Sequence, residues 1–161
     1  MRPIALLAAV AALAATPALA QNAGQIASAR GGASCAGCNL FQADFSRTEL
    51  RGKSFAGARL RQADLSGSVM NRTSFARADL RDVEAYGAVF TGASFAGANL
   101  TGASFVGTYL QGATFRGAVL EGANFSGAEM DRAVGLTQAQ LNRACGDATT
   151  RLPRSMTIPP C

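Results

Sequence analysis

Residues 98–130 read ANL-TGASF-VGTYL-QGATF-RGAVL-EGANF-SGAEM. A large apolar residue recurs at every fifth position, and the same register continues from residue 40 to residue 130. Of these nineteen central positions, eight are Leu, eight are Phe and two are Met, and the exception is Ala85. An α-helix has a period of about 3.6 residues and a simple strand has a period of two, so neither fits this spacing. The pattern therefore predicts a chain that turns a corner every five residues.

Small residues accompany the large ones at fixed offsets. Two residues before the central position, Ala occurs in twelve of nineteen units, and two residues after it, Gly occurs in twelve of nineteen. Ala fits beside a large side chain in a narrow interior, and Gly supplies the permissive backbone angles that a corner needs. We therefore expect the central residue and the Ala to point inward, and the other positions to face outward.

Central residues that lie twenty positions apart form columns of one residue type. One column contains only Leu, at positions 40, 60, 80, 100 and 120, and another contains only Phe, at positions 55, 75, 95 and 115. Such columns favour four units per coil, because each side chain then packs on its counterpart one coil away. Three or five units per coil would mix both columns.

The unit resembles the A-(D/N)-L-x-x repeat of the pentapeptide-repeat family. It stands here as Ala43-Asp44-Phe45, Ala63-Asp64-Leu65, Ala78-Asp79-Leu80, Ala98-Asn99-Leu100 and Ala123-Asn124-Phe125. The resemblance covers residues 38–132 and implies an all-β solenoid, the right-handed quadrilateral β-helix of that family. Nineteen units at four per coil make 4.75 coils of 20 residues. Stacking at the strand spacing of ~4.8 Å then predicts a rod about 23 Å long.

The first twenty residues have the layout of a secretory signal peptide. Arg2 precedes an apolar stretch, and Ala18-Leu19-Ala20 forms a small-x-small cleavage site. The alternative is an uncleaved anchor, but the stretch is shorter than the ~20 apolar residues that a membrane helix needs and contains Pro17. We therefore expect an exported protein, periplasmic or extracellular, whose mature chain begins at Gln21 and has no transmembrane segment after cleavage.

Both ends of the predicted rod need covers, because open ends expose apolar side chains and unpaired backbone groups. Residues 21–37 are assigned to an N-terminal cap, and residues 133–161 to a C-terminal cap with a tail. The chain is thus divided into residues 1–20, 21–37, 38–132 and 133–161.

A short capping helix is predicted near residues 138–145. Thr137 and Gln140 have the spacing of a capping box. Leu136 and Leu141 fit the two positions of a hydrophobic staple, and Gly146 suits the position just beyond the helix. Such a helix would cover the last coil.

Four cysteines permit three disulfide pairings. Cys35 and Cys38 lie at one end of the predicted rod, and Cys145 and Cys161 lie beyond the other. Bridged Cα atoms lie within ~7 Å of each other, a distance much shorter than the rod, so the geometry favours Cys145–Cys161 and Cys35–Cys38. A redox role for Cys35 and Cys38 is the alternative to a structural one, although no βαβ pattern surrounds them.

The composition speaks against catalysis. The chain contains no His, so Ser-His triads, Cys-His dyads and His-ligated metal sites are excluded. The glycines follow the repeat and do not form a phosphate-binding loop between a strand and a helix. We therefore expect a protein without enzymatic activity, cofactor or metal.

Acidic side chains stack at one set of outward positions. Asp44, Asp64 and Glu84 lie twenty residues apart. They could hold a divalent cation or act as an acid/base pair. The alternative is a solvated ladder of ion pairs, because Arg61 and Arg81 lie three residues before Asp64 and Glu84.

Basic side chains are concentrated in residues 47–81, which contain eight basic and three acidic residues. A basic surface can bind nucleic acid, anionic lipid or cell-wall polymer, whereas a scattered belt serves solubility. The columns distribute these residues over all four faces, which favours the belt, and Lys53 falls at an inward position from which it can extend out of the open end. The eight are Arg47, Arg51, Lys53, Arg59, Arg61, Arg72, Arg77 and Arg81.

Five apolar residues at outward positions form the best candidate for a partner surface. They are Val69, Tyr86, Val89, Val106 and Tyr109. In columns of twenty they fall on adjacent faces around one corner, and contiguous exposed apolar surface with Tyr is typical of interaction sites. The alternative is that β-branched and aromatic residues merely suit strands.

These features favour a structural or protein-interaction module that binds an unknown protein, a cell-envelope component or a second copy of the chain as a homodimer. The resemblance offers an alternative, because some family members mimic duplex DNA and bind DNA gyrase, which gives quinolone resistance. Those rods are strongly acidic, whereas residues 38–132 here contain ten basic and nine acidic residues. We therefore expect neither gyrase nor nucleic acid as a partner.

Overall fold

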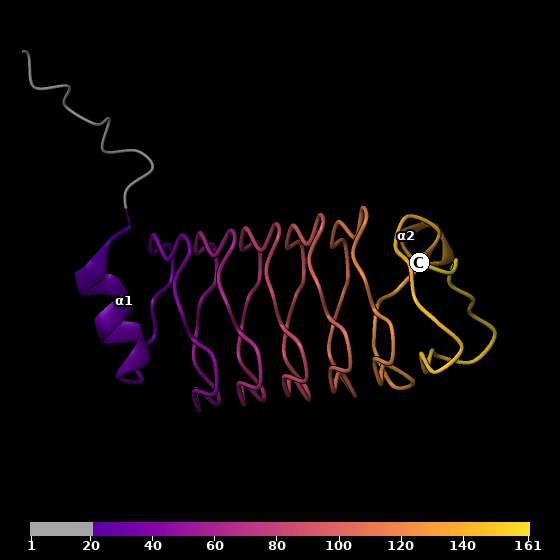
Figure 1. The fold of residues 1–161 in the computed structure, drawn as a ribbon, viewed down its shortest axis with the longest axis horizontal. Coiled ribbons are helices and arrows are strands. Elements are labelled where there is room, and N and C mark those ends of the chain that lie inside the picture. The colour runs from indigo at the N-terminus through magenta and orange to yellow at the C-terminus, as the bar shows by residue number, and fades with distance from the viewer. Residues whose placement is uncertain (1–20) are drawn as a thin grey trace, which may run out of the picture.

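The backbone repeats every twenty residues. The computed structural model describes residues 21–161, and in this part of the chain single residues form parallel bridges with residues one coil later. Examples are Asn39 with Arg59, Ser54 with Ser74, and Val89 with Tyr109. These bridges hold together the stack of coils between the two ends of the molecule in Figure 1. The twenty-residue spacing predicted from the Leu and Phe columns is therefore confirmed.

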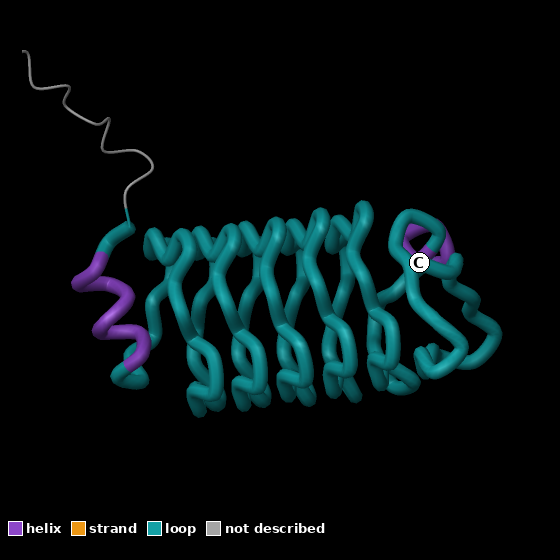
Figure 2. Tube along the Cα trace, viewed as in Figure 1, coloured by secondary structure: helices purple, strands orange, loops and turns teal. Residues whose placement is uncertain are grey.

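The sides of the coils are too short to form extended strands. Within residues 21–161 the regular elements are two helices, α1 (Ala23–Arg30) and α2 (Gln138–Leu141), so Figure 2 shows the coils as loops. A turn follows each central residue, as where the N–H of Ala43 donates to the carbonyl of Leu40 at 3.1 Å. The expectation of an all-β solenoid thus holds for the bridging pattern but not for strand content, because a corner interrupts every side after about two residues.

The residue two places after each central position from 40 to 125 has a positive φ. Twelve of these corner residues are Gly, and the other six have φ between 53° and 59°. A type II turn requires a positive φ at this position, and the left-handed conformation costs a residue with a Cβ ~1–2 kcal/mol. We call the six corners without Gly the strained corners, and all of them lie in the first half of the stack. They are Gln42, Arg47, Gln62, Arg72, Arg77 and Asp82.

The interior contains the central side chains and their small neighbours. The Phe rings stack along one column, with centroids 5.3 Å apart between Phe75 and Phe95 and 5.2 Å apart between Phe95 and Phe115. A few inward positions are polar, and the hydroxyl of Thr108 donates to the carbonyl of Phe105 at 2.8 Å. The hydroxyl of Ser68 is buried without a hydrogen-bond partner among residues 21–161. Lys53 at its inward position is half-buried.

Helix α1 covers the N-terminal end of the stack. Asn22 caps it by accepting the N–H of Gln25, and the Gln25 side chain in turn accepts the N–H of Asn39 at 2.8 Å. The bonds between coils begin where the N–H of Cys35 donates to the carbonyl of Ser54 at 2.7 Å, three residues before the predicted boundary. The predicted signal peptide, residues 1–20, lies outside the residues that the structure describes.

Helix α2 covers the other end, and the predicted capping box is confirmed. The Thr137 hydroxyl accepts the N–H of Gln140, and the Gln140 side chain accepts the N–H of Thr137. The side-chain nitrogen of Gln140, Nε2, also donates to the carbonyls of Phe115 and Ala118, at 2.9 and 2.8 Å, which fastens the helix to the coil.

The helix is shorter than predicted, because it ends at Leu141 and its C-cap is Asn142. Gly146 does not end the helix but forms a bridge with Pro160, while Cys145 bridges Asn124. The tail therefore continues the stack in irregular form. No helix in residues 21–161 is long and apolar enough to cross a membrane.

Candidate partner surface

Val69, Val89 and Tyr109 form one ladder along the stack. Val69 bridges Val89, and Val89 bridges Tyr109. The N–H of Phe90 donates to the carbonyl of Tyr109 at 2.8 Å, so the main chain fixes the spacing of these side chains. The two Val are half-buried, and the Tyr109 residue is 45% exposed. The predicted column is therefore present on the surface.

Tyr86 and Val106 form a second, neighbouring column. The N–H of Gly67 donates to the carbonyl of Tyr86, and the N–H of Gly87 donates to that of Val106, at 2.8 and 3.0 Å. Tyr86 is 65% exposed and lies across a single turn from Val89, where the N–H of Ala88 donates to the carbonyl of Ala85. All five residues chosen from the sequence thus lie around one corner.

A shallow groove of about 510 Å³ adjoins this corner on the side of Tyr86. The groove was not predicted from the sequence, although Ser46 and Ser66, which follow central positions one coil apart, were a usable signal. Its lining combines polar side chains with two glycines and the Tyr86 ring. The lining residues are Ser46, Arg47, Asp64, Ser66, Gly67, Tyr86 and Gly87.

The acidic ladder predicted from the sequence borders the groove, and its member Asp64 lines it. Asp44 bridges Asp64, and Asp64 bridges Glu84. Hydrogen bonds from Ser46 hold the pKa of Asp44 below its usual range, and Arg30 adds an ion pair at 3.2 Å. The described residues contain no group of carboxylates or cysteines able to hold a metal ion.

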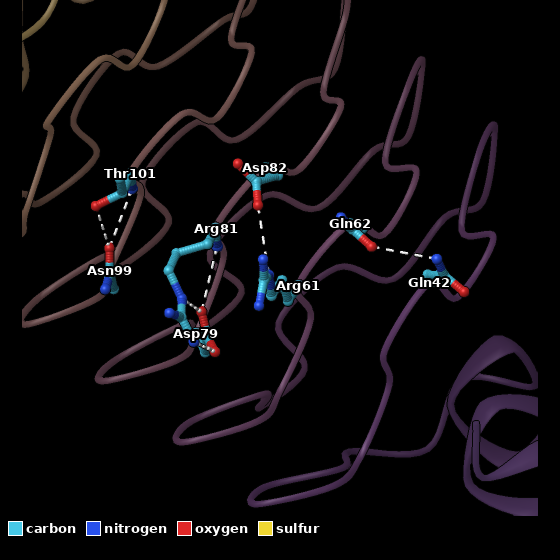
Figure 3. A network of polar contacts seen from close by, with 8 residues as sticks. All are labelled: Gln42, Arg61, Gln62, Asp79, Arg81, Asp82, Asn99 and Thr101. Carbon is cyan, nitrogen blue, oxygen red and sulfur yellow. Dashed lines mark hydrogen bonds and ion pairs between the residues drawn. The ribbon is translucent and has the colours of Figure 1, made fainter. Parts of the chain in front are cut away.

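The expected ion pairs between this ladder and two arginines are absent from the described part of the chain. Arg81 instead makes a two-pronged contact with Asp79, at 2.7 and 2.6 Å, and Arg61 lies 3.4 Å from Asp82 (Figure 3). The contact with Arg81 lowers the pKa of Asp79. The expectation was wrong because Arg81 bonds to a carboxylate two residues earlier, and Arg61 bonds to a corner residue of the next coil.

The arginines of the strained corners lie lengthwise over the next coil. The Cγ atoms of Arg47 and Arg72 lie 3.6 and 3.5 Å from where a Cβ would stand on Gly67 and Gly92. A guanidinium on such a stem stays at the surface. This arrangement fits the predicted belt, in which the basic side chains spread over several corners.

All four cysteines are paired within the ends of the stack. Cys35 is bonded to Cys38 and Cys145 to Cys161, with Cα atoms 5.4 and 4.8 Å apart. Cys35 is buried five residues before Leu40, the first central residue, whereas Cys161 joins the tail to the bridged Cys145. Both bonds therefore secure the ends of the stack.

Comparison with known proteins identifies the repeat. The family described as pentapeptide repeats matches residues 54–92, 73–112, 98–134 and 108–145, in eight copies. The chain belongs to the pentapeptide-repeat family. No curated protein matches it significantly.

Two solved pentapeptide-repeat proteins superpose on the chain. HetL from the cyanobacterium Nostoc sp. strain PCC 7120, involved in regulating heterocyst differentiation, is 26% identical with a TM-score of 0.55. The match covers 75% of this chain and 57% of HetL, so the chain spans little more than half of that protein. Rfr23 from the cyanobacterium Cyanothece 51142 is 24% identical, with a TM-score of 0.59 over 70% of this chain and 96% of Rfr23. These pentapeptide-repeat structures support the fold.

Proposed function

We propose that the protein is an exported, non-enzymatic interaction module built on a right-handed quadrilateral pentapeptide-repeat solenoid of about 4.75 coils. Its partner, a protein or another component of the cell envelope, binds the corner formed by five apolar residues. They are Val69, Tyr86, Val89, Val106 and Tyr109.

The observation that carries this proposal is the exposure of two aromatic rings on a rigid scaffold. Tyr86 is 65% exposed and Tyr109 is 45% exposed, although the central side chains of the repeats are almost fully buried. Backbone bonds between coils order the surface in advance, so binding there costs little conformational entropy. Function in such scaffolds belongs to the surface and not to the fold itself.

Two observations support export to the periplasm or the extracellular space. The first is the signal-peptide pattern in residues 1–20. The second is the pairing of all four cysteines, because disulfides persist in oxidising compartments and are rare in the cytosol. Fractionation of cells that produce the untagged chain tests this part, and recovery of the protein only from the cytoplasm would contradict it.

The partner surface is tested by Tyr86→Asp combined with Tyr109→Asp. We expect crosslinking and pull-down from the extracytoplasmic fraction to lose the partner that wild type captures. The melting temperature should stay within a few degrees of wild type, because both rings point away from the interior.

Val119→Asp is the matched control. Val119 is 48% exposed and occupies an outward ladder position on another face, where it bridges Asn99. It should retain the partner. Unfolding of the double variant would show that the rings are structural, and unchanged capture would show that the corner is ordinary surface.

A further inference from the structure

Two carboxylates beside the apolar corner have no basic partner within residues 21–161. Asp64 and Glu84 bridge each other along the stack, and Asp64 lines the groove next to Tyr86. The Asp64 carboxylate accepts the N–H of Ser66 at 2.8 Å, which fixes its position without neutralising it. Asp44, by contrast, is paired with Arg30.

The basic side chains near Asp64 and Glu84 either form ion pairs with other carboxylates or are fewer than these two carboxylates. Arg61 and Arg81 are held by Asp82 and Asp79, as Figure 3 shows. Arg47 lines the groove and makes no ion pair with a described carboxylate, but it is one cation against two carboxylates. The surface around Tyr86 therefore has a local excess of negative charge on a chain whose formal net charge is +5.

The size of the apolar strip limits what can cover it. Val69, Val89 and Tyr109 lie on successive coils, ~4.8 Å apart, so the ladder is about 10 Å long. A stable dimer buries about 800 Å² on each partner, which a strip of this length does not supply. A short extended segment matches it better than a second folded copy of the chain.

We infer that the surface binds an extended polypeptide segment of a partner in which a lysine or arginine stands next to apolar side chains. The apolar side chains contact the ladder of Val69, Val89 and Tyr109. The cation lies between Asp64 and Glu84, where the exposed face of Tyr86 adds a cation–π contact. This inference rests on the proposed function, since it names the partner chemistry for the same surface.

Two labelled hexapeptides test the charge preference by fluorescence anisotropy with the purified protein. One alternates lysine with valine, and the other alternates glutamate with valine. The net positive charge of the chain favours the glutamate peptide at long range. We expect the lysine peptide nevertheless to bind at least about tenfold more tightly, and this preference to weaken with salt, as an interaction between exposed charges must.

Asp64→Asn combined with Glu84→Gln should abolish the preference. The Asn side chain keeps an oxygen that can accept the Ser66 N–H, so the fold is preserved, which circular dichroism verifies. Glu121→Gln combined with Asp131→Asn is the control that removes two negative charges outside the groove, one of them paired with Arg143 at 2.6 Å. It should leave the preference unchanged.

The outcomes separate this inference from the proposed function. Equal affinity for both peptides, no binding of either, or a preference that persists in the Asp64 and Glu84 variant overturns the inference. If Tyr86→Asp with Tyr109→Asp still loses the captured partner in that case, the proposed surface stands and only its charge chemistry is wrong.

Discussion

Val83 and Ala85 show how single residues share the interior of a coil. Ala85 is the one small residue at a central position, and Val83 replaces the small residue that usually stands two places earlier. Both are fully buried. The larger Val compensates in volume for the smaller Ala, so the coil is filled by a local exchange of sizes.

This exchange predicts non-additive mutations. Ala85→Leu alone should overpack the coil and lower the free energy of unfolding by about 1–3 kcal/mol. Val83→Ala alone should also destabilise it, because it leaves a cavity. The double variant should return to within about 1 kcal/mol of wild type, since the two changes restore the usual pattern. Urea denaturation of the four proteins measures the coupling, and additive losses would show that the two side chains do not share space.

The inward residues were predictable from the sequence because their spacing is fixed by steric packing. The partners of long polar side chains were not predictable in this way. Arg61 and Arg81 form ion pairs with Asp82 and Asp79, and not with Asp64 and Glu84, the carboxylates expected from the column pattern. A guanidinium on a flexible stem has several carboxylates within reach, and the sequence spacing does not rank them. The groove beside Tyr86 was missed for a related reason, since it depends on which side chains leave space at a corner.

At the scale of elements, one carboxylate contributes to holding the C-terminal cap in place. Asp147 accepts hydrogen bonds from the hydroxyl and N–H of Thr149, at 2.7 and 2.9 Å, and from the N–H of Gly127 at 3.0 Å. These bonds, led by that from the hydroxyl, lower the pKa of Asp147 to about 2. The carboxylate thus joins the tail to the last coil.

The lowered pKa predicts that the cap loosens in acid. The unfolded chain binds a proton at Asp147 more readily than the folded chain, so this contribution is complete above about pH 4 and is lost as the pH falls toward 2. As the pH falls over this range, the protection of the amides in residues 145–161 against hydrogen exchange, relative to an unfolded chain at the same pH, should therefore decrease before that of the coils. In Asp147→Asn the acid-dependent step should largely disappear from the tail. An identical acid response in that variant would contradict the assignment.

The two caps differed in how far the sequence revealed them. The capping box of Thr137 and Gln140 is a local motif, and it marked the start of α2 correctly. Helix α1 begins with a similar spacing, Asn22 three residues before Gln25, which was not recognised from the sequence because the apolar residues that follow are mainly Ala and only Ala29 is buried. Its position depends on contacts with the first coil, such as the bond from Asn39 to the Gln25 side chain.

At the scale of the molecule, the Phe column runs through the stack and joins coils that are otherwise linked by backbone bonds. The Phe75 ring stacks on those of Phe55 and Phe95, with centroids 5.6 and 5.3 Å apart. It also meets the ring of Phe90 edge-on at 5.9 Å. In a solenoid each coil contacts only the coils next to it, so a defect in one coil weakens its neighbours directly.

Phe75→Ala should therefore lower the free energy of unfolding by ~3–5 kcal/mol. Phe41→Ala is the control, because Phe41 is the one Phe that stands at a corner and is only half-buried. Thermal and urea denaturation of both variants measure the difference. A melting temperature unchanged by Phe75→Ala would contradict the placement of the ring inside the stack.

The bridges between residues twenty apart also bear on how such a chain can change in length over evolution. A duplication or deletion of twenty codons within the stack moves every later residue by one whole coil, so each column keeps its residue type and each corner keeps its place. A change of five codons moves every later residue to the neighbouring face of the coil, so that Phe side chains then stack on Leu side chains. Genes for this architecture can therefore drift in length by whole coils, and the distance between the two capped ends changes while each face keeps its character.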